Sequence, residues 1–159
     1  MSIELGKWDR RFLGLAAHVA KWSKDPSTQV GAVIANDKRV VSLGFNGFPQ
    51  GLSDDHRLHD RETKYSLVLH AEENALLFAN SDLTGNTIYV YPLPPCSRCA
   101  AKIIQTGITR VVTTIPDDMS RWEDSVALTR TIFQESGVEM VEVPLAANSI
   151  QTDGTMPFK

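Results

Sequence analysis

Two short stretches of the sequence carry side chains that bind soft divalent metals. His70 lies in the first stretch, and Cys96 and Cys99 form a Cys-x-x-Cys pair in the second. Thiolate and imidazole groups are the ligands that Zn²⁺ prefers, and three protein ligands leave the fourth tetrahedral position open to water. An open position is typical of catalytic zinc, whereas structural sites are closed. Since the chain has only two cysteines, a structural site of four cysteines is excluded.

Glu72 lies two residues after His70, and its carboxylate could act beside the metal without binding it. Zinc lowers the pKa of a bound water from about 16 towards about 7, so that hydroxide is available at neutral pH. A carboxylate in this place could take the water proton, deliver it to a ring nitrogen and help an amino group to leave as ammonia. We therefore interpret Glu72 as the catalytic acid–base and the His and Cys residues as zinc ligands.

Each motif has a simpler interpretation when it is taken alone. A Cys-x-x-Cys pair also suits a redox pair or half of a structural zinc site, and a lone His-x-Glu is frequent by chance. Together and in this order, His70-Ala71-Glu72 and Pro95-Cys96-Ser97-Arg98-Cys99 match the signature of zinc nucleobase deaminases. That signature predicts attack of zinc-bound hydroxide on C4 of a cytosine ring.

Length and composition are those of one globular domain, with 159 residues of which 42% are hydrophobic and 22% charged. We expect a single domain over 1–159, with a core at about 8–143 and a polar tail over 144–159. The net charge of -3 argues against a nucleic-acid partner. No run reaches the roughly 20 apolar residues of a membrane span. The N-terminus lacks the apolar segment of a secretory signal, so we expect a cytoplasmic protein without a membrane partner.

Hydrophobic periodicity predicts helices and strands that alternate after an opening hairpin. The order predicts an α/β fold in which helices cover both faces of a mixed sheet. Both metal-binding stretches would lie at helix starts, where partial positive charge favours thiolates. A long polar connection over 46–64 is typical of a functional loop. The predicted helices are 8–24, 66–80, 97–106 and 121–136, and the predicted strands are 30–35, 39–45, 87–91, 108–115 and 138–143.

Further stretches outside the zinc motifs resemble the deoxycytidylate deaminase family. They are residues 23–32 (SKDPSTQVGA), 44–51 (GFNGFPQG), Lys64-Tyr65 and 103–108 (IIQTGI), and the resemblance covers about 8–143. It implies a three-layer α/β/α sandwich with a five-stranded sheet that converts dCMP to dUMP in pyrimidine nucleotide biosynthesis. It also implies a homo-oligomer, usually a homo-hexamer, with dCTP as activator, dTTP as inhibitor and Mg²⁺ as a companion of the regulatory nucleotide.

Several residues are candidates for nucleotide contacts. The amide of Asn46 suits a sugar hydroxyl, and glycines nearby allow close backbone approach to a phosphate. Lys64 and Arg98 are possible phosphate partners, although solvated surface is the commoner fate of a lone base. Tyr65 could border the base or pack in the core. The candidate substrate contacts are Asn46, Lys64, Tyr65, Ala71, Pro95 and Arg98, and the candidate regulatory contacts are Asn46, Gly47, Phe48 and Gly51.

Other conspicuous residues receive no catalytic role. We interpret the acidic and histidine-rich segment 54–60 as a polar loop, not as a second metal site. His18 is expected to pack or to face solvent on the first helix. Glu73 should point away from the catalytic glutamate, and Trp122 is expected in the core or at an oligomer contact.

Four alternative functions remain open at this level. A tRNA adenosine deaminase shares the zinc chemistry, but the acidic charge balance and segment 46–51 disfavour it. A deaminase of free bases or nucleosides would lack a phosphate-binding cluster. Within the family, dCTP or a 5-substituted dCMP could be the substrate. A non-enzymatic zinc-binding module would have no use for the Glu72 carboxylate.

Overall fold

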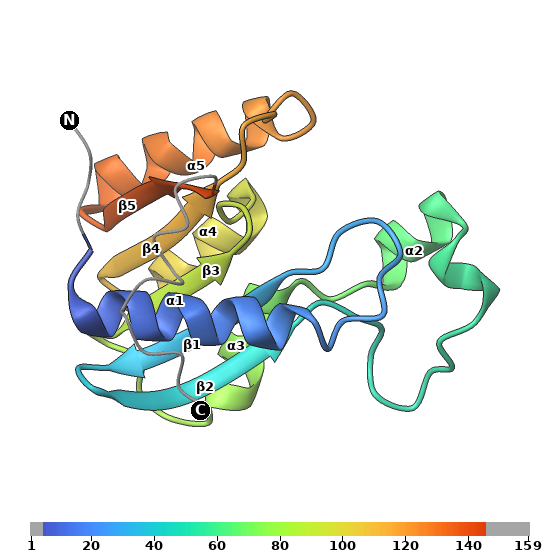
Figure 1. Ribbon diagram of the computed structural model, residues 1–159, viewed down its shortest axis with the longest axis horizontal. Coiled ribbons are helices and arrows are strands. Elements are labelled where there is room, and N and C mark those ends of the chain that lie inside the picture. Colours follow the sequence, from blue (N-terminus) through green and yellow to red (C-terminus); the bar gives the residue numbers. More distant parts are fainter. Residues whose placement is uncertain (1–4, 146–159) are drawn as a thin grey trace, which may run out of the picture.

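The computed structural model describes residues 5–145, which form a five-stranded mixed sheet with helices on both faces (Figure 1). The strand order is β2-β1-β3-β4-β5; β1 is antiparallel to β2 and β3, whereas the pairs β3/β4 and β4/β5 are parallel. The predicted α/β sandwich is confirmed. The strands are β1 (Gly31–Asn36), β2 (Arg39–Phe45), β3 (Thr87–Tyr91), β4 (Arg110–Ile115) and β5 (Glu139–Pro144). The helices are α1 (Lys7–Ala20), α2 (Arg61–Leu67), α3 (Ala71–Ala79), α4 (Ser97–Gln105) and α5 (Glu123–Ser136), with a short 3-10 helix η1 (His56–Leu58).

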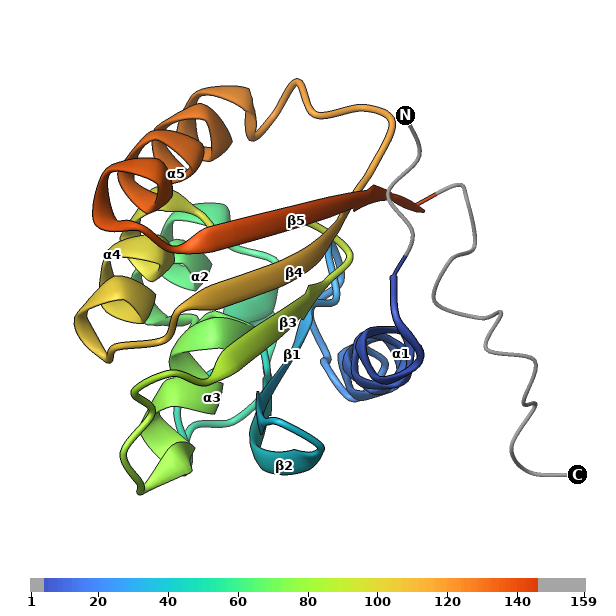
Figure 2. The ribbon, with the colours of Figure 1, turned by 90° about the vertical axis from the view of Figure 1, so that its left-hand side faces the viewer.

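The sheet separates two hydrophobic cores. Figure 2 shows α1 on one face and α3, α4 and α5 on the other. Successive side chains of a strand point to opposite faces, so Val33 of β1 packs on the α1 side while Ile34 packs on the side of α3 and α4. Of the described helices, none has the length and apolar character needed to cross a membrane.

Helix α3 approaches β2 so closely that only glycine fits between them. A Cβ atom on Gly44 would lie 2.5 Å from the carbonyl oxygen of Ala71 and 2.5 Å from the amide nitrogen of Ala75. Backbone therefore packs on backbone at this point. Because α3 begins directly after His70, this contact sets the position of that side chain relative to the sheet.

The first helix ends earlier than its hydrophobic pattern predicts. α1 stops at Ala20, not near residue 24, and the amides of Trp22 and Ser23 bond to carbonyls of its last turn. The Ser23 hydroxyl donates to the carbonyl of Asn46 at 2.8 Å, which draws the chain away from the helix axis. Trp22, just beyond the helix, is 49% exposed and lies edge-on to the ring of Phe45.

The helix predicted over 66–80 is two helices in the structure. α2 and α3 are separated at Val68–His70, where Leu69 exchanges two backbone hydrogen bonds with Gly47, of 2.8 and 3.1 Å. This bridge holds the residues between α2 and α3 in an extended conformation, so they continue neither helix. η1 and the first part of α2 also fall inside segment 46–64, which was predicted as a loop, and Figure 1 shows this part beyond the end of the sheet. Nearly all of the predicted tail over 144–159 lies outside the described residues.

Replacement of Gly44 by alanine should destabilise the fold, since the new Cβ would overlap the α3 backbone. We expect the free energy of unfolding to fall by about 2 to 3 kcal/mol, the usual scale for overpacking. Urea titration followed by circular dichroism measures the change. Gly47→Ala is the control, since no heavy atom outside the neighbouring residues lies within 4 Å of a Cβ at that position. Equal stabilities of the two variants would contradict the packing argument.

Candidate active site

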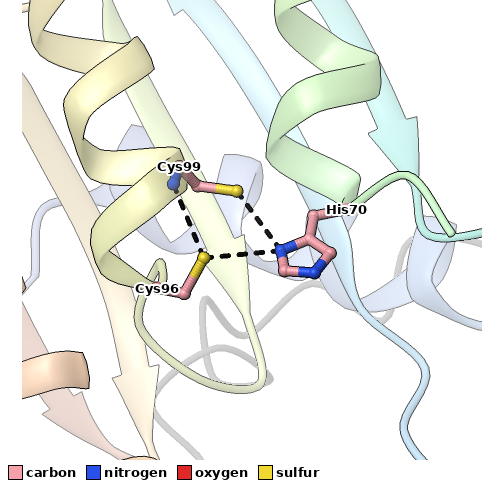
Figure 3. Close-up of side chains that lie close together, drawn as sticks. All are labelled: His70, Cys96 and Cys99. Atoms are coloured by element: carbon pink, nitrogen blue, oxygen red, sulfur yellow. Dashed lines mark hydrogen bonds between the residues drawn. The ribbon is translucent and has the colours of Figure 1, made fainter. Parts of the chain in front are cut away.

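His70, Cys96 and Cys99 converge between the N-terminal ends of two helices (Figure 3). His70 is the N-cap residue of α3, Cys96 is the N-cap residue of α4, and Cys99 lies in the first turn of α4. The Nδ1 atom of His70 lies 3.5 Å from Sγ of Cys96 and 3.3 Å from Sγ of Cys99. Tetrahedral zinc bonded to sulfur and nitrogen at ordinary lengths separates these atoms by about 3.6 Å. The donor set therefore fits zinc with little rearrangement.

The cysteine segment is held in place by α5. The amide of Ser97 donates to the hydroxyl of Ser125 at 3.0 Å, and the hydroxyl of Thr129 donates to the carbonyl of Pro95 at 2.8 Å. The amide of Cys99 in turn points at Sγ of Cys96 at 3.5 Å. A backbone donor at the start of α4 thus faces the sulfur atom of Cys96, which suits a thiolate.

Interactions among the protein groups alone favour a negative charge on Cys96 and a positive charge on His70. The Cys99 thiol and the His70 ring lower the pKa of Cys96 to about 4, while the Cys96 sulfur raises the pKa of His70 to about 9. The hydrogen bond between the two cysteines, together with burial, raises the pKa of Cys99. Burial raises the pKa of the Glu72 carboxyl to about 7. An acid–base group is most effective when its pKa lies near the working pH.

A cavity of about 140 Å³ opens beside these groups, and His70, Glu72 and Cys96 are part of its lining. Four predicted substrate contacts also line it, namely Asn46, Lys64, Tyr65 and Ala71. The remaining lining residues are Asp25, Ser27, Thr28, Val30, Val68, Leu93, Pro94, Arg121 and Trp122. The cavity thus joins the metal-binding residues to the loop 21–30, α2 and the start of α5.

Two predicted substrate contacts do not line the cavity. Arg98 is exposed on α4. Because each helical residue turns by about 100° from its neighbour, Arg98 cannot share the direction of Cys99. Pro95 is buried and its carbonyl is bonded to Thr129; its neighbour Pro94 lines the cavity instead.

Asn46 and Lys64 form the wall of the cavity through bonds to the chain itself. The Asn46 amide accepts from the amide of Val30 and donates to the carbonyl of Thr28, both at 2.9 Å. The Lys64 ammonium donates to Asp25 Oδ1 at 3.1 Å and approaches the Ser27 hydroxyl at 3.3 Å. Side chains 64 and 25 are only 8% and 7% exposed. Lys64 is therefore a buried cation neutralised by Asp25, not the solvated surface base that the sequence left open. Its contact with a phosphate stays a prediction.

The predicted regulatory residues other than Asn46 lie outside the cavity lining. Gly47 pairs with Leu69, Gly51 has a φ of +88° that favours glycine, and the Phe48 ring lies 5.8 Å from the Arg57 guanidinium. Their role in nucleotide regulation stays a prediction.

The structure also places residues that received no role from the sequence. His18 is exposed and lies edge-on to Trp22. In segment 54–60, each aspartate has a polar side-chain partner: Asp54 pairs with Lys24, Asp55 with Arg57, and Asp60 accepts from the Thr63 hydroxyl.

Arg121 and Trp122 were missed as cavity residues. Trp122, expected in the core or at an oligomer contact, lines the cavity, and the Arg121 guanidinium lies 5.1 Å from the centre of its ring. The sequence signal was an Arg-Trp pair at a helix start, but nothing local indicates that this helix faces the metal-binding residues.

The comparisons with known proteins agree with this architecture. The family model described as the cytidine and deoxycytidylate deaminase zinc-binding region matches residues 6–115. An Aliivibrio fischeri protein, described as an uncharacterized deaminase in the luxG 3′ region, is 50% identical over 143 residues, or 89% of this chain and 97% of that protein. Deoxycytidylate deaminase of Homo sapiens is 40% identical over 140 residues, or 83% of this chain and 77% of that protein.

A solved structure shares the fold and part of the sequence. Cyanophage S-TIM5 dCMP deaminase, in complex with dCMP and dUMP, superimposes with a TM-score of 0.70 and 26% identity over 83% of this chain and 93% of that chain. The fold and the His–Cys–Cys donor set define a zinc-binding deaminase domain. The chain belongs to the cytidine and deoxycytidylate deaminase family, as its motifs predicted.

Removal of the Lys64 charge should leave the buried Asp25 carboxylate without its ion-pair partner, with the neutral N–H donors of Ser27, Thr28 and Asn46 beside it. We expect Lys64→Met to lower the free energy of unfolding by about 3 to 5 kcal/mol. Asp25→Asn should lower it less in the Lys64→Met variant than in the wild-type protein. Denaturant unfolding of both single variants and the double variant measures this coupling. Lys24→Met, which breaks an exposed pair with Asp54, is the matched control and should cost less than about 1 kcal/mol. A Lys64 variant as stable as this control would contradict the argument.

Proposed function

We propose that the protein hydrolyses dCMP to dUMP and ammonia. The observation that carries this proposal is one cavity lined by two of the three candidate zinc ligands, the buried Glu72 carboxyl and an unneutralised arginine. Relatives named deoxycytidylate deaminase at 40% identity support it. The cyanophage relative, crystallised with dCMP and dUMP, supports the same substrate and product.

In the proposed reaction, His70, Cys96 and Cys99 hold zinc, and Glu72 moves the protons. Zinc bound there supplies the polarisation that makes water a nucleophile at neutral pH. Glu72 takes a proton from the water that attacks C4 and delivers it to N3 of the ring. It next takes the proton of the new C4 hydroxyl and passes it to the amino group, the C4–N bond breaks, and ammonia leaves as the C4 carbonyl forms. Burial raises the pKa of the Glu72 carboxyl, so holding a proton between the two transfers costs less than it would for an exposed carboxyl.

The cavity suits a planar base that carries an anionic group. Tyr65 and Trp122 offer aromatic surfaces for the base. Of the lining cations, Lys64 is paired with Asp25, whereas Arg121 has no carboxylate partner among residues 5–145. Glu123 and Asp124 follow it in the first turn of α5 but do not line the cavity. We assign the phosphate contact to Arg121, because a guanidinium binds phosphate through paired hydrogen bonds.

The finer properties expected from the sequence belong to the same proposal. The resemblance implies a homo-oligomer, activation by dCTP, inhibition by dTTP and Mg²⁺ as a companion of the regulatory nucleotide. Length and composition imply a single domain over 1–159 and a cytoplasmic location. Millimolar dCTP and dTTP without effect on dCMP turnover would count against regulation.

Ammonia release from a panel of substrates tests the proposed activity. The purified, zinc-replete protein is incubated with dCMP, CMP, dCTP, deoxycytidine, cytosine and guanine. Preference for dCMP is expected. Preference for deoxycytidine or a free base would overturn the phosphate contact and retain the deaminase chemistry. Preference for dCTP would mean that the phosphate site accepts three phosphate groups. Inactivity on all six compounds would contradict the proposed substrate class.

Glu72→Gln should abolish turnover while zinc stays bound, since the amide cannot carry protons but keeps the shape of the side chain. We expect kcat to fall at least about a hundredfold, in the range of lost general acid–base catalysis. Metal analysis should still find one zinc per chain. Turnover at the wild-type rate would rule out the proposed role.

Arg121→Met should weaken binding of the phosphate and leave the chemistry intact. Loss of a charge-assisted hydrogen bond costs about 1.5 to 3 kcal/mol, so kcat/KM for dCMP should fall about ten- to a hundredfold. The value for deoxycytidine should change little, since that compound carries no phosphate. Arg98→Met is the control, because Arg98 is exposed outside the cavity. An equal loss on both substrates would reject the phosphate assignment.

A further inference from the structure

Glu73 connects two backbone segments of the candidate metal site although it does not line the cavity. One carboxylate oxygen, Oε1, accepts the backbone N–H of His70 at 3.0 Å. The other oxygen, Oε2, pairs with the ammonium of Lys102 on α4. One side chain therefore touches the residue that begins α3 and the helix that carries both cysteines.

The geometry makes this connection short. Glu73 is the third residue of α3, and a glutamate at this position commonly accepts the N-cap amide in a capping box. Lys102 lies three residues after Cys99, and residues three apart share one face of a helix. The link from His70 to Cys99 thus runs through a single carboxylate and a single ammonium group.

We propose that Glu73 and Lys102 are positioning residues that hold α3 and α4 at the separation at which His70 and the two cysteines bind one zinc ion. The proposal goes beyond the deaminase activity but depends on the ligand role of these three residues. Groups that orient metal ligands without touching the metal typically change metal affinity by about ten- to a hundredfold when they are removed.

A purely structural role gives a different expectation. The side chains of Lys102 and Glu73 are 45% and 19% exposed, and exposed ion pairs contribute about 0 to 1 kcal/mol to stability. If the pair only joined two surfaces, its loss would leave the zinc site unchanged. Zinc affinity and ligand geometry therefore separate the two roles, whereas thermal stability alone would not.

The experiment compares five variants with the wild-type protein. Glu73→Leu removes both contacts, Glu73→Gln keeps an oxygen for the His70 amide, Lys102→Met removes the ammonium, and Lys102→Arg keeps the charge. Arg130→Met is the matched control, because its ion pair with Glu142 has nearly the same exposure, 45% and 24%, and joins α5 to β5, neither of which carries a metal-binding residue. Zinc affinity is measured by competition with a chromophoric chelator, and ligand geometry by the visible spectrum of the Co²⁺-substituted protein.

We expect zinc affinity to fall about ten- to a hundredfold in Glu73→Leu and by a smaller factor in Glu73→Gln and Lys102→Met. The Co²⁺ ligand-field bands should shift in the same order. Lys102→Arg and Arg130→Met should remain within about twofold of the wild type. Because the Gln and Met changes preserve side-chain size, they keep the test open if the Leu variant does not fold.

Two results overturn different parts of the account. If the wild-type protein binds zinc and the Glu73 and Lys102 variants bind it equally well with unchanged Co²⁺ spectra, the positioning role is wrong. If the wild-type protein binds no zinc, the ligand set is wrong, and the positioning role is wrong with it.

Discussion

The separation between the first turns of α3 and α4 is the constraint on which the rest of the structure depends. The two metal-binding stretches are 26 residues apart in sequence, yet the His70 and Cys96 ligand atoms lie 3.5 Å apart. Three groups of contacts accompany this arrangement. Gly44 lets α3 approach the sheet, Ser125 and Thr129 hold the cysteine segment, and Glu73 contacts both helices. An error of about 1 Å in any of them would separate donor atoms that one ion must reach together.

A second set of contacts gives the cavity its charge. The pair of Lys64 and Asp25 is buried, so the wall that it forms is close to neutral. Asn46 holds the loop beside it through its own amide group and through its carbonyl, which accepts from Ser23. Arg121, at the start of α5, also lines the cavity and has no carboxylate partner among residues 5–145. This charge is the basis on which we propose a nucleotide, and not an uncharged base, as the substrate.

Features governed by local sequence were predicted well. The hairpin of β1 and β2, the strand β3 and the helix α4 follow from periodicity and turn residues, and the ligand motif follows from residue type and spacing. The break between α2 and α3 was not predictable in this way, because it comes from pairing of Leu69 with Gly47 across 22 residues. Arg98 and Arg121 show the same limit. The first adjoins a ligand in sequence but faces away, whereas the second is distant in sequence and lines the cavity.

X-ray absorption at the zinc edge of the purified protein tests the central claim most directly, since it reports the atoms bound to the metal. The account predicts one zinc per chain with two sulfur neighbours at about 2.3 Å and two nitrogen or oxygen neighbours at about 2.0 to 2.1 Å. One of the light atoms would be His70 and the other a water in the open position. A shell with fewer than two sulfur atoms, or a protein that retains no zinc, would contradict the account.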